Sequence, residues 1–248
     1  MTRKTIVITD LTQMPRGDRV CIAGIDATGT CIRPVVEPRD TGVTKSLLYS
    51  RDKPIVVPRA RIEFDLHPIT EEAPHVEDMG FDPEHVLNKG VCSASEWERT
   101  LSTNSYDAVN IGYDGLLQNN RWVKPGAQTK SLITLRQPEL LEASIKPGDR
   151  SYKPRLVFKD AMGERFECAV TDLALWTLCH SLISQQGLTQ EKALQTILDS
   201  IVDADRLYIR LGLARPWQTS SGEQRCYLLV SAVHTFPDYL KGKTFAEF

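Results

Sequence analysis

Three features are missing from the 248-residue sequence, and each absence removes a class of protein. No run approaches the ~18 apolar residues that a membrane helix needs, and the apolar stretch after the basic start is too short for a signal peptide. Neither G-x-G-x-x-G nor G-x-x-x-x-G-K-[ST] occurs, so a dinucleotide or NTP-hydrolysing site of known type is not expected. G-x-S-x-G is missing too, which disfavours a serine hydrolase. We therefore expect a cytoplasmic protein with no membrane partner, no cofactor and no catalytic residue.

Closely spaced cysteine pairs are also absent. The six cysteines are scattered and form no C-x-x-C motif, whereas structural zinc sites need such pairs to set a tetrahedron. Most of them lie in apolar runs, where a reduced thiol behaves as a small core residue. Cys179 and His180 are neighbours on an expected helix and point about 100° apart, so they cannot act together as nucleophile and base.

The chain has little net charge, −2, but the charge is distributed in blocks. Residues 1–61, 121–159 and 206–248 carry net charges of +5, +6 and +3, whereas residues 62–120 and 160–205 carry −10 and −6. This alternation predicts basic and acidic surfaces that are separated in space. A basic face could bind a polyanion even on a nearly neutral protein, because the local potential attracts phosphate.

The basic blocks are also rich in predicted strands. Short β-branched or alternating runs occupy residues 5–11, 20–26, 30–36, 55–66, 131–135, 155–160, 165–173, 207–214 and 225–236. Three helices are expected, over residues 94–101, 172–185 and 189–202, with Ser93, Asp172 and Thr189 as N-caps. The pattern predicts a mainly β protein with helical inserts, built either as two small barrels or as one larger sandwich. The stretch VKPGAQTK (123–130) is the best candidate boundary, which gives domains 1–125 and 126–248.

The acidic stretch 67–86 gathers His67, His75 and His85 with six acids. Imidazole and carboxylate together suit Mn, Fe or Zn, so a metal-dependent hydrolase acting on nucleotides is one alternative. The spacing is irregular and three prolines interrupt it, which favours a solvated acidic loop instead. Such a loop could cover a basic face when no ligand is bound. As a further alternative, acidic segments 62–120 and 160–205 could bind a protein partner.

Two expected strands end on an arginine followed by a proline, at Arg33-Pro34 and Arg215-Pro216. Proline donates no amide hydrogen bond and lies at strand ends or edges, so these arginines are expected where a side chain can reach outward. An arginine fork suits phosphate oxygens and its flat face stacks on bases, and Trp217, Tyr208 and Tyr227 would add stacking surfaces. In the structural alternative, Arg33 pairs with an acid such as Asp10 or Asp26, and Trp217 plugs a barrel end.

The segments TIVITDLTQM, VCIAGIDATGTCIRPV and RCYLLVSAVHTFPDYLKGKTF resemble the bacterial dual OB-fold domain proteins. The resemblance covers nearly the whole chain and implies two OB-like barrels and a nucleic-acid-binding role. It also implies a setting in a mobile-element or phage-defence system, with the protein as an adaptor. An OB barrel binds across one sheet face and between its loops.

These observations predict a non-catalytic protein that binds nucleic acid, with single-stranded DNA or RNA favoured, through basic OB-like surfaces. The predicted nucleic-acid-binding residues are Arg33, Arg59, Arg61, Lys153, Arg155, Tyr208, Arg210, Arg215 and Trp217. No metal ligand is assigned.

Overall fold

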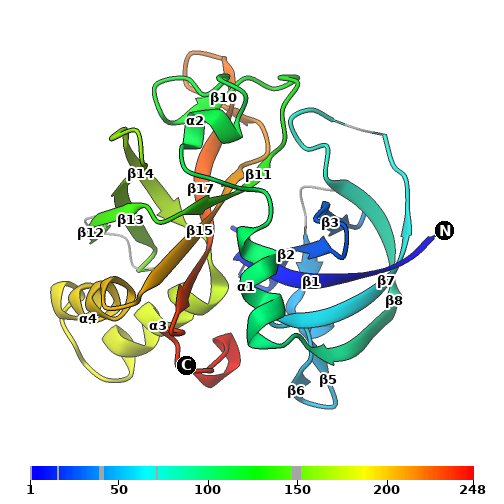
Figure 1. The fold of residues 1–248 in the computed structure, drawn as a ribbon, viewed down its shortest axis with the longest axis horizontal. Helices are drawn as coiled ribbons and strands as arrows, with labels where there is room; N and C mark the ends of the chain where they lie inside the picture. Colours follow the sequence, from blue (N-terminus) through cyan, green and yellow to red (C-terminus); the bar gives the residue numbers. More distant parts are fainter. Residues whose placement is uncertain (1, 16, 39–41, 71, 147–151) are drawn as a thin grey trace.

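Two β-rich bodies lie side by side in the computed structural model, which describes residues 2–15, 17–38, 42–70, 72–146 and 152–248 (Figure 1). The N-terminal body is on the right of the view and the C-terminal body, with most of the helix, is on the left. The strands of the first body are β1 (Thr2–Gln13), β2 (Arg19–Asp26), β3 (Cys31–Val35), β4 (Val43–Thr44), β7 (Ala60–His67) and β8 (Asp78–Val91). A small hairpin of β5 (Tyr49–Ser50) and β6 (Lys53–Pro54) projects from it, after the 3-10 helix η2 (Lys45–Leu48).

The first body is a closed barrel of five strands. Its order is β1-β7-β8-β3-β2, and β1 pairs with β2 to complete the circle, while β4 extends one edge of β2. All neighbours on the circle are antiparallel except β3 and β8, which run parallel. In strand β7 the even-numbered residues from Ala60 to Leu66 are buried, and charged residues alternate with them on the outside. This alternation gives the strand one apolar face for the barrel interior and one polar face for the solvent.

The second body repeats this strand order. Its strands are β9 (Ser105–Tyr106), β10 (Trp122–Val123), β11 (Leu132–Arg136), β12 (Glu139–Ile145), β13 (Pro154–Lys159), β14 (Arg165–Val170), β15 (Arg206–Leu213), β16 (Trp217–Gln218) and β17 (Gln224–Phe236). The path is β12-β13-β14-β17-β15-β11-β9, and β14 and β17 run parallel as β3 and β8 do. Only Gln137 and Pro138 separate β11 from β12, and Gln137 has a left-handed φ of 48°. The two segments therefore act as one bent first strand, which pairs with β15 at one end and with β13 at the other.

The three predicted helices are present with the predicted N-caps. Helix α1 (Ala94–Ser102) begins after Ser93, α3 (Leu173–Ser184) after Asp172 and α4 (Gln190–Val202) after Thr189. Each cap side chain accepts a hydrogen bond from a backbone N–H of the first turn, as capping requires. Helices α3 and α4 connect β14 to β15, and the short α2 (Val109–Gly112) and the 3-10 helix η3 (Phe245–Glu247) complete the chain.

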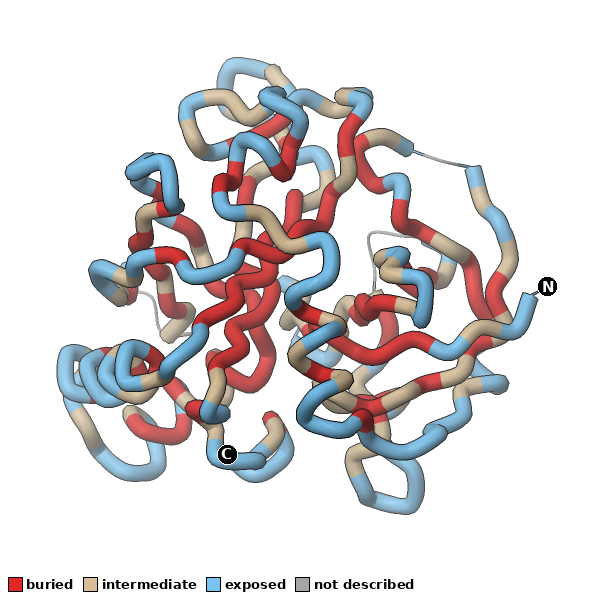
Figure 2. Tube along the Cα trace, viewed as in Figure 1, coloured by how far each residue is buried: buried red, intermediate tan, exposed pale blue. Residues whose placement is uncertain are grey.

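Each body has its own apolar core, and Figure 2 shows the buried strands of the second body running through the centre of the view. Val109, Tyr113 and Val123 pack into the second core, and β9 and β10 pair with strands of the second sheet. The C-terminal core therefore draws on residues from 105 onward, upstream of the expected division at residue 125. Leu173 and Ala174 of α3 pack into the first core instead.

The expectation of a solvated acidic loop over residues 67–86 is wrong for much of that stretch. Strand β8 begins at Asp78 and forms part of the barrel, and His75, Glu77 and Asp78 are buried. The high charge of the segment concealed this strand, because charge density normally indicates a solvated chain. Glu77 has its partner Ser131 in the second body, and Asp78 pairs with one arginine from each body, Arg33 and Arg215.

Candidate nucleic-acid interface

The nine predicted binding residues lie in three separate places. Arg33, Tyr208, Arg210 and Arg215 lie in the seam, which is our name for the buried polar contact layer between the two bodies. Arg59 and Arg61 belong to the first barrel, near α1. Lys153, Arg155 and Trp217 belong to the outer side of the second body.

The seam is centred on a buried ion pair between Asp10 of β1 and Arg210 of β15. The Arg210 Nε donates to Asp10 Oδ2 at 2.9 Å, and both side chains are almost completely buried. Ser231 and Thr9 donate their hydroxyls to the same carboxylate at 2.5 and 2.6 Å. Burial raises the pKa of Asp10, but Arg210 and these hydroxyls outweigh it, so the pKa lies below its ordinary value.

The same seam contains Arg33 and Arg215, and their shared strand-ending pattern has a structural meaning. Arg33 Nε donates to Asp78 Oδ1 at 2.5 Å, and Arg215 Nη2 donates to Asp78 Oδ2 at 2.6 Å. One arginine from each body thus holds the first residue of β8. The predicted outward reach of Arg33 is wrong, because its side chain is only 7% exposed. Its acid partner is Asp78, and neither Asp10 nor Asp26 takes that place.

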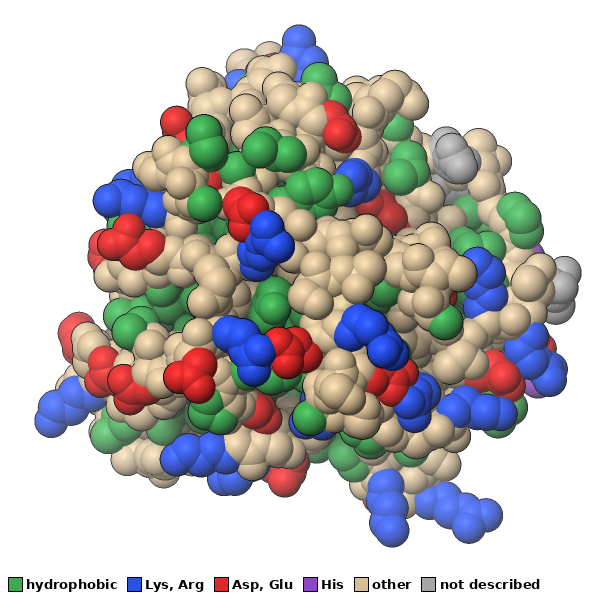
Figure 3. Space-filling view, viewed as in Figure 1, with side chains coloured by type: hydrophobic (Ala, Val, Ile, Leu, Met, Phe, Trp, Pro, Cys, Tyr) green, Lys and Arg blue, Asp and Glu red, His purple; other side chains and the backbone are tan. Residues whose placement is uncertain are grey.

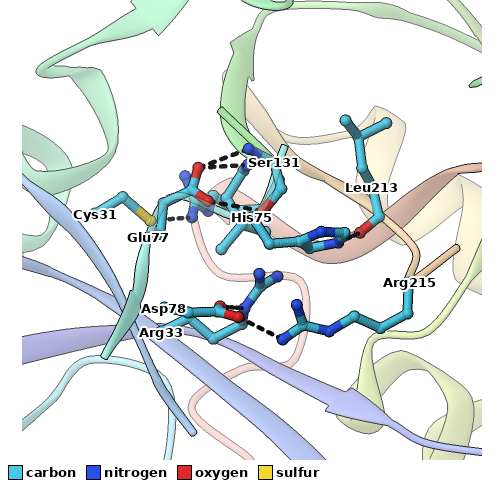
Figure 4. Close-up of polar contacts among 10 residues, drawn as sticks. Cys31, Arg33, His75, Glu77, Asp78, Ser131, Leu213 and Arg215 are labelled. Carbon is cyan, nitrogen blue, oxygen red and sulfur yellow. Dashed lines mark hydrogen bonds and ion pairs between the residues drawn. The ribbon is translucent and has the colours of Figure 1, made fainter. Parts of the chain in front are cut away.

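Residues of the acidic segment complete this part of the seam (Figure 4). The carboxylate of Glu77 accepts hydrogen bonds from the Ser131 hydroxyl at 2.8 Å and from the backbone N–H groups of Ser131 and Leu132 at 2.7 and 3.0 Å. His75 Nε2 lies 3.2 Å from the carbonyl oxygen of Leu213. Burial, together with Arg33 and Arg215, lowers the pKa of His75 to about 3, so the ring is neutral at pH 7.

Tyr208 and Arg210 also lie in this layer, so neither offers a surface to a ligand in this structure. Tyr208 packs with Val7, Trp97 and Leu101 in a small apolar cluster between the bodies. The expectation that Tyr208 is a stacking surface fails because β15 turns this side chain toward the first barrel and α1.

Arg61 lies on the first barrel beside a pocket of about 270 Å³, and Arg59 is not among the residues that line it. Arg61 lines the pocket and pairs through Nε and Nη2 with the carboxylate of Glu96 on α1. Arg59 is half-buried at the start of β7, where its backbone N–H donates to the Ile8 carbonyl. The remaining lining includes the turn 26–29 and Arg99, Thr100 and Thr103 of the α1 region.

A second pocket, of about 280 Å³, lies on the outer face of β13, β14 and β17. Its lining residues are Arg121, Arg155, Glu167, Ala169, Tyr227, Leu228 and Leu229. Arg155 and Ala169 are neighbours across β13 and β14, and Ala169 neighbours Leu229 across β14 and β17. Leu156 and Cys168, on the opposite faces of β13 and β14, point into the core. The predicted residue Arg155 therefore lies on the outer sheet face, with Lys153 just ahead of it in the chain.

Aromatic rings continue this outer face along β17. Arg225 and Tyr227 share it, because they are two residues apart, and their register partners are Trp217 and Trp122. The Arg225 guanidinium lies over the Trp122 ring at 4.4 Å from its centroid. Trp217 is 67% exposed, so it does not plug a barrel end. Sequence reasoning named Tyr227 as a stacking surface but missed Arg121 and Arg225, because only the strand pairing brings these residues together.

The charge blocks neutralise one another instead of forming separate surfaces. Arginines of the basic blocks pair with acids of the two acidic blocks in Arg3–Asp65, Arg61–Glu96, Arg136–Asp107, Arg155–Glu167 and Arg206–Glu98. The face drawn in Figure 3 accordingly shows basic and acidic side chains interspersed. On the second pocket's face, Arg121 is exposed, and no hydrogen bond or ion pair of its side chain is found among the described residues.

The histidines of the metal alternative are dispersed. His85 pairs with Asp82 on the surface, while His75 lies in the seam. Across the described part of the chain, no group of three or more His, Cys, Asp or Glu side chains is arranged to hold a metal ion. Among the described residues, no helix is long and apolar enough to cross a membrane.

A closed barrel with the order 1-2-3-5-4, repeated in a second sheet with helices between its third and fourth strands, defines a protein of two OB-type units. The family model of the dual OB-containing domain matches residues 4–233, and the chain belongs to this family. The resemblance seen in the sequence is confirmed, as is the mainly β fold with two OB-like units. No curated protein matches the sequence.

Proposed function

We propose that this protein binds single-stranded nucleic acid on the outer face of β13, β14 and β17. The observation that carries the proposal is the pocket of about 280 Å³ on this face, which combines Arg121 and Arg155 with the ring of Tyr227. OB folds bind oligonucleotides across their second and third strands, and β13 and β14 are those strands of the second unit.

The chemistry of the face fits a single strand better than a duplex. Stacking on an aromatic ring needs an unpaired base, and Tyr227 and the exposed Trp217 offer rings on one face. Arg121 and Arg155 supply the charge for the phosphates that separate such bases. Glu167 neutralises part of Arg155 through a contact of 2.9 Å, so this face favours moderate affinity without a sequence code.

Fluorescence anisotropy with a labelled 20-mer oligonucleotide tests the proposal at 50 and 200 mM salt. With one phosphate contact at each of the two arginines, affinity for a single strand falls roughly sevenfold between these salt concentrations through counterion release. The double variant Arg121→Gln/Arg155→Gln should bind at least about tenfold more weakly and show a shallower salt dependence. Its matched control is Arg136→Gln, which removes an exposed arginine of the same sheet that pairs with Asp107.

Absence of binding at 50 mM salt would contradict the proposal, and so would a double variant that binds like the wild type. Replacing the oligonucleotide by a duplex of the same length separates the single-strand preference from charge alone. An adaptor role in a mobile-element or phage-defence system remains a prediction that rests on the family resemblance, and an oligonucleotide-dependent pull-down would test it.

A further inference from the structure

An acid, Glu167 of β14, lines the second pocket beside its two arginines. One oxygen of this carboxylate, Oε1, accepts a hydrogen bond from Arg155 Nε at 2.9 Å. The other oxygen, Oε2, has no hydrogen-bond partner among the described residues, and the side chain is 39% exposed. A carboxylate only accepts hydrogen bonds, so a ligand that covers Oε2 must bring a donor or leave this oxygen unsatisfied.

Glu167 lies between a cation and an aromatic ring of the pocket. In the sheet, β14 has β13 on one side and β17 on the other (Figure 1). Arg155 of β13 contacts the Glu167 carboxylate directly. On the other side β14 and β17 are parallel, with Ala169 level with Leu229, so Glu167 is level with Tyr227 two residues earlier. Guanidinium, carboxylate and phenol ring therefore follow one another across three strands, each about 4.8 Å from the next.

This order matches the order of groups in a nucleotide, where the sugar joins the phosphate to the base. A strand with a phosphate at Arg155 and a base stacked on Tyr227 places the sugar over Glu167. RNA and DNA differ at this sugar, because ribose carries a 2′-hydroxyl that donates a hydrogen bond and deoxyribose has only C–H there. A carboxylate that accepts from the ribose 2′-hydroxyl is also found in dinucleotide-binding folds.

We propose that the second pocket selects RNA over DNA, with Glu167 Oε2 as the acceptor of a ribose 2′-hydroxyl. This inference rests on the proposed binding of a single strand at the same face and specifies the sugar of that strand. With DNA, the covered carboxylate gains no donor and lies near phosphates whose charge repels it. With RNA, a hydrogen bond to a charged acceptor offsets both costs. The selection concerns the sugar alone, so it needs no sequence code.

A purely structural role for Glu167 predicts a different result. If the carboxylate only holds Arg155 in place, its removal changes the affinities for RNA and DNA by the same factor. If it accepts from the 2′-hydroxyl, its removal weakens the binding of RNA relative to DNA. The ratio of the two affinities therefore separates recognition of the sugar from positioning of the arginine.

Fluorescence anisotropy with labelled 20-mers of uridine and of deoxyuridine, at 50 mM salt, measures this ratio. The two strands have the same base and the same charge and differ only at the 2′ position. The wild type should bind the RNA strand about tenfold more tightly, as expected for a hydrogen bond to a charged acceptor. A 20-mer of 2′-O-methyluridine, which lacks the donor, should bind like the DNA strand.

Glu167→Ala should reduce the preference for RNA to no more than about twofold, because it removes the acceptor. Its Tm should stay close to that of the wild type, because the side chain lies on the outer sheet face. The matched control is Glu139→Ala, which removes an exposed acid from β12 of the same sheet and should keep the full preference. If Glu167→Ala does not fold, Glu167→Val, which suits a strand better, takes its place.

Equal affinities of the wild type for the uridine and deoxyuridine strands would overturn this inference and leave the proposed function standing. A preference for RNA that persists in Glu167→Ala would overturn it too, because the 2′-hydroxyl would then be bound elsewhere. The same holds if the 2′-O-methyl strand binds as tightly as RNA. Absence of binding by every strand would contradict the proposed function itself.

Discussion

The two OB units of this chain share a strand order but differ in the surfaces they present. The pocket of the first unit lies between the β2–β3 turn and α1 and is lined by threonines and the Arg61–Glu96 pair, with no aromatic ring among its described lining residues. The pocket of the second unit lies on a strand face, where Tyr227 accompanies two arginines. The same fold therefore carries two different chemistries, and only the second resembles a platform for bases.

The units also differ in what they bury against each other. The first contributes mainly acids to the seam, Asp10, Glu77 and Asp78, whereas the second contributes Arg210, Arg215 and backbone N–H groups. A seam of this kind fixes the relative position of the two units, because buried charges need specific partners. The units therefore differ in surface chemistry and are joined by a buried network of charges and hydrogen bonds.

The largest expected effect comes from breaking the central ion pair. Asp10→Asn keeps the side-chain shape but leaves Arg210 as a buried charge without its counter-charge. We expect the free energy of unfolding to fall by roughly 3–5 kcal/mol, as measured by urea titration. Arg136→Gln, which breaks an exposed pair with Asp107, should cost less than about 1 kcal/mol. Similar losses in the two variants would show that the seam does not hold the units together.

Acid should weaken the seam through two buried histidines. Burial lowers the pKa of His75 to about 3 and that of His234 to about 4, from 6.5, so the unfolded chain binds more protons below pH 6.5 and stability falls as the pH falls. From pH 7 to pH 5 each histidine should remove about 2 kcal/mol. Asp172 acts in the opposite direction, because burial raises its pKa to about 6 and the folded state then takes up a proton.

Urea unfolding of His75→Gln at both pH values isolates one of these histidines. The loss of stability between pH 7 and pH 5 should be about 2 kcal/mol smaller than in the wild type. An identical loss would mean that His75 is protonated within the folded seam.

A smaller effect should separate the two surfaces. Trp217→Ala removes an exposed ring from the second unit and should weaken oligonucleotide binding about tenfold, with an unchanged Tm. Arg99→Gln, in the pocket of the first unit, should change affinity by no more than about twofold. Anisotropy titrations of both variants test the contrast, and a reversed order would move the binding face to the first barrel.

The smallest effect concerns the helices that each unit carries. Ser93→Ala in front of α1 and Thr189→Ala in front of α4 each remove an N-cap that accepts a backbone hydrogen bond. Each should cost about 1 kcal/mol of unfolding free energy, measured by urea titration. A much larger cost for Ser93→Ala would show that α1, which lies between the units, contributes to their association.

The sequence was sufficient to predict local secondary structure, but not the long-range contacts of the buried side chains. The caps of α1, α3 and α4 and the alternation of β7 depend on neighbouring residues, so they can be read from short windows. Strand β8 could not be recognised, because the acids at its start are neutralised by Arg33 and Arg215, which lie 45 and 137 residues away from Asp78. Binding at Arg33 was predicted from its position before Pro34 at a strand end, whereas its burial in the seam depends on the same long-range contacts.

For the residues on the outer side of the second unit, the sequence indicated which side chains could bind nucleic acid, but not which residues lie beside them. Arg155 and Trp217 were singled out for charge and stacking, and the structure places both on the outer side of the second unit. Their companions Arg121, Arg225 and Tyr227 join them only through the pairing of β10, β14 and β16 with β17. The register of strand pairing depends on long-range contacts, so it cannot be read from a single sequence.

The pairing of Asp10 with Arg210 has a consequence for the order in which the protein is made. The ribosome delivers the first barrel before residue 210 exists, so Asp10 lacks Arg210, and Asp78 has only Arg33, while the rest of the chain is synthesised. The side of the nascent barrel that later forms the seam carries an excess of negative charge. This charge disfavours aggregation with other apolar chains until the second unit has been made. Once β15 and Arg215 have been synthesised, their arginines pair with these acids and the seam forms.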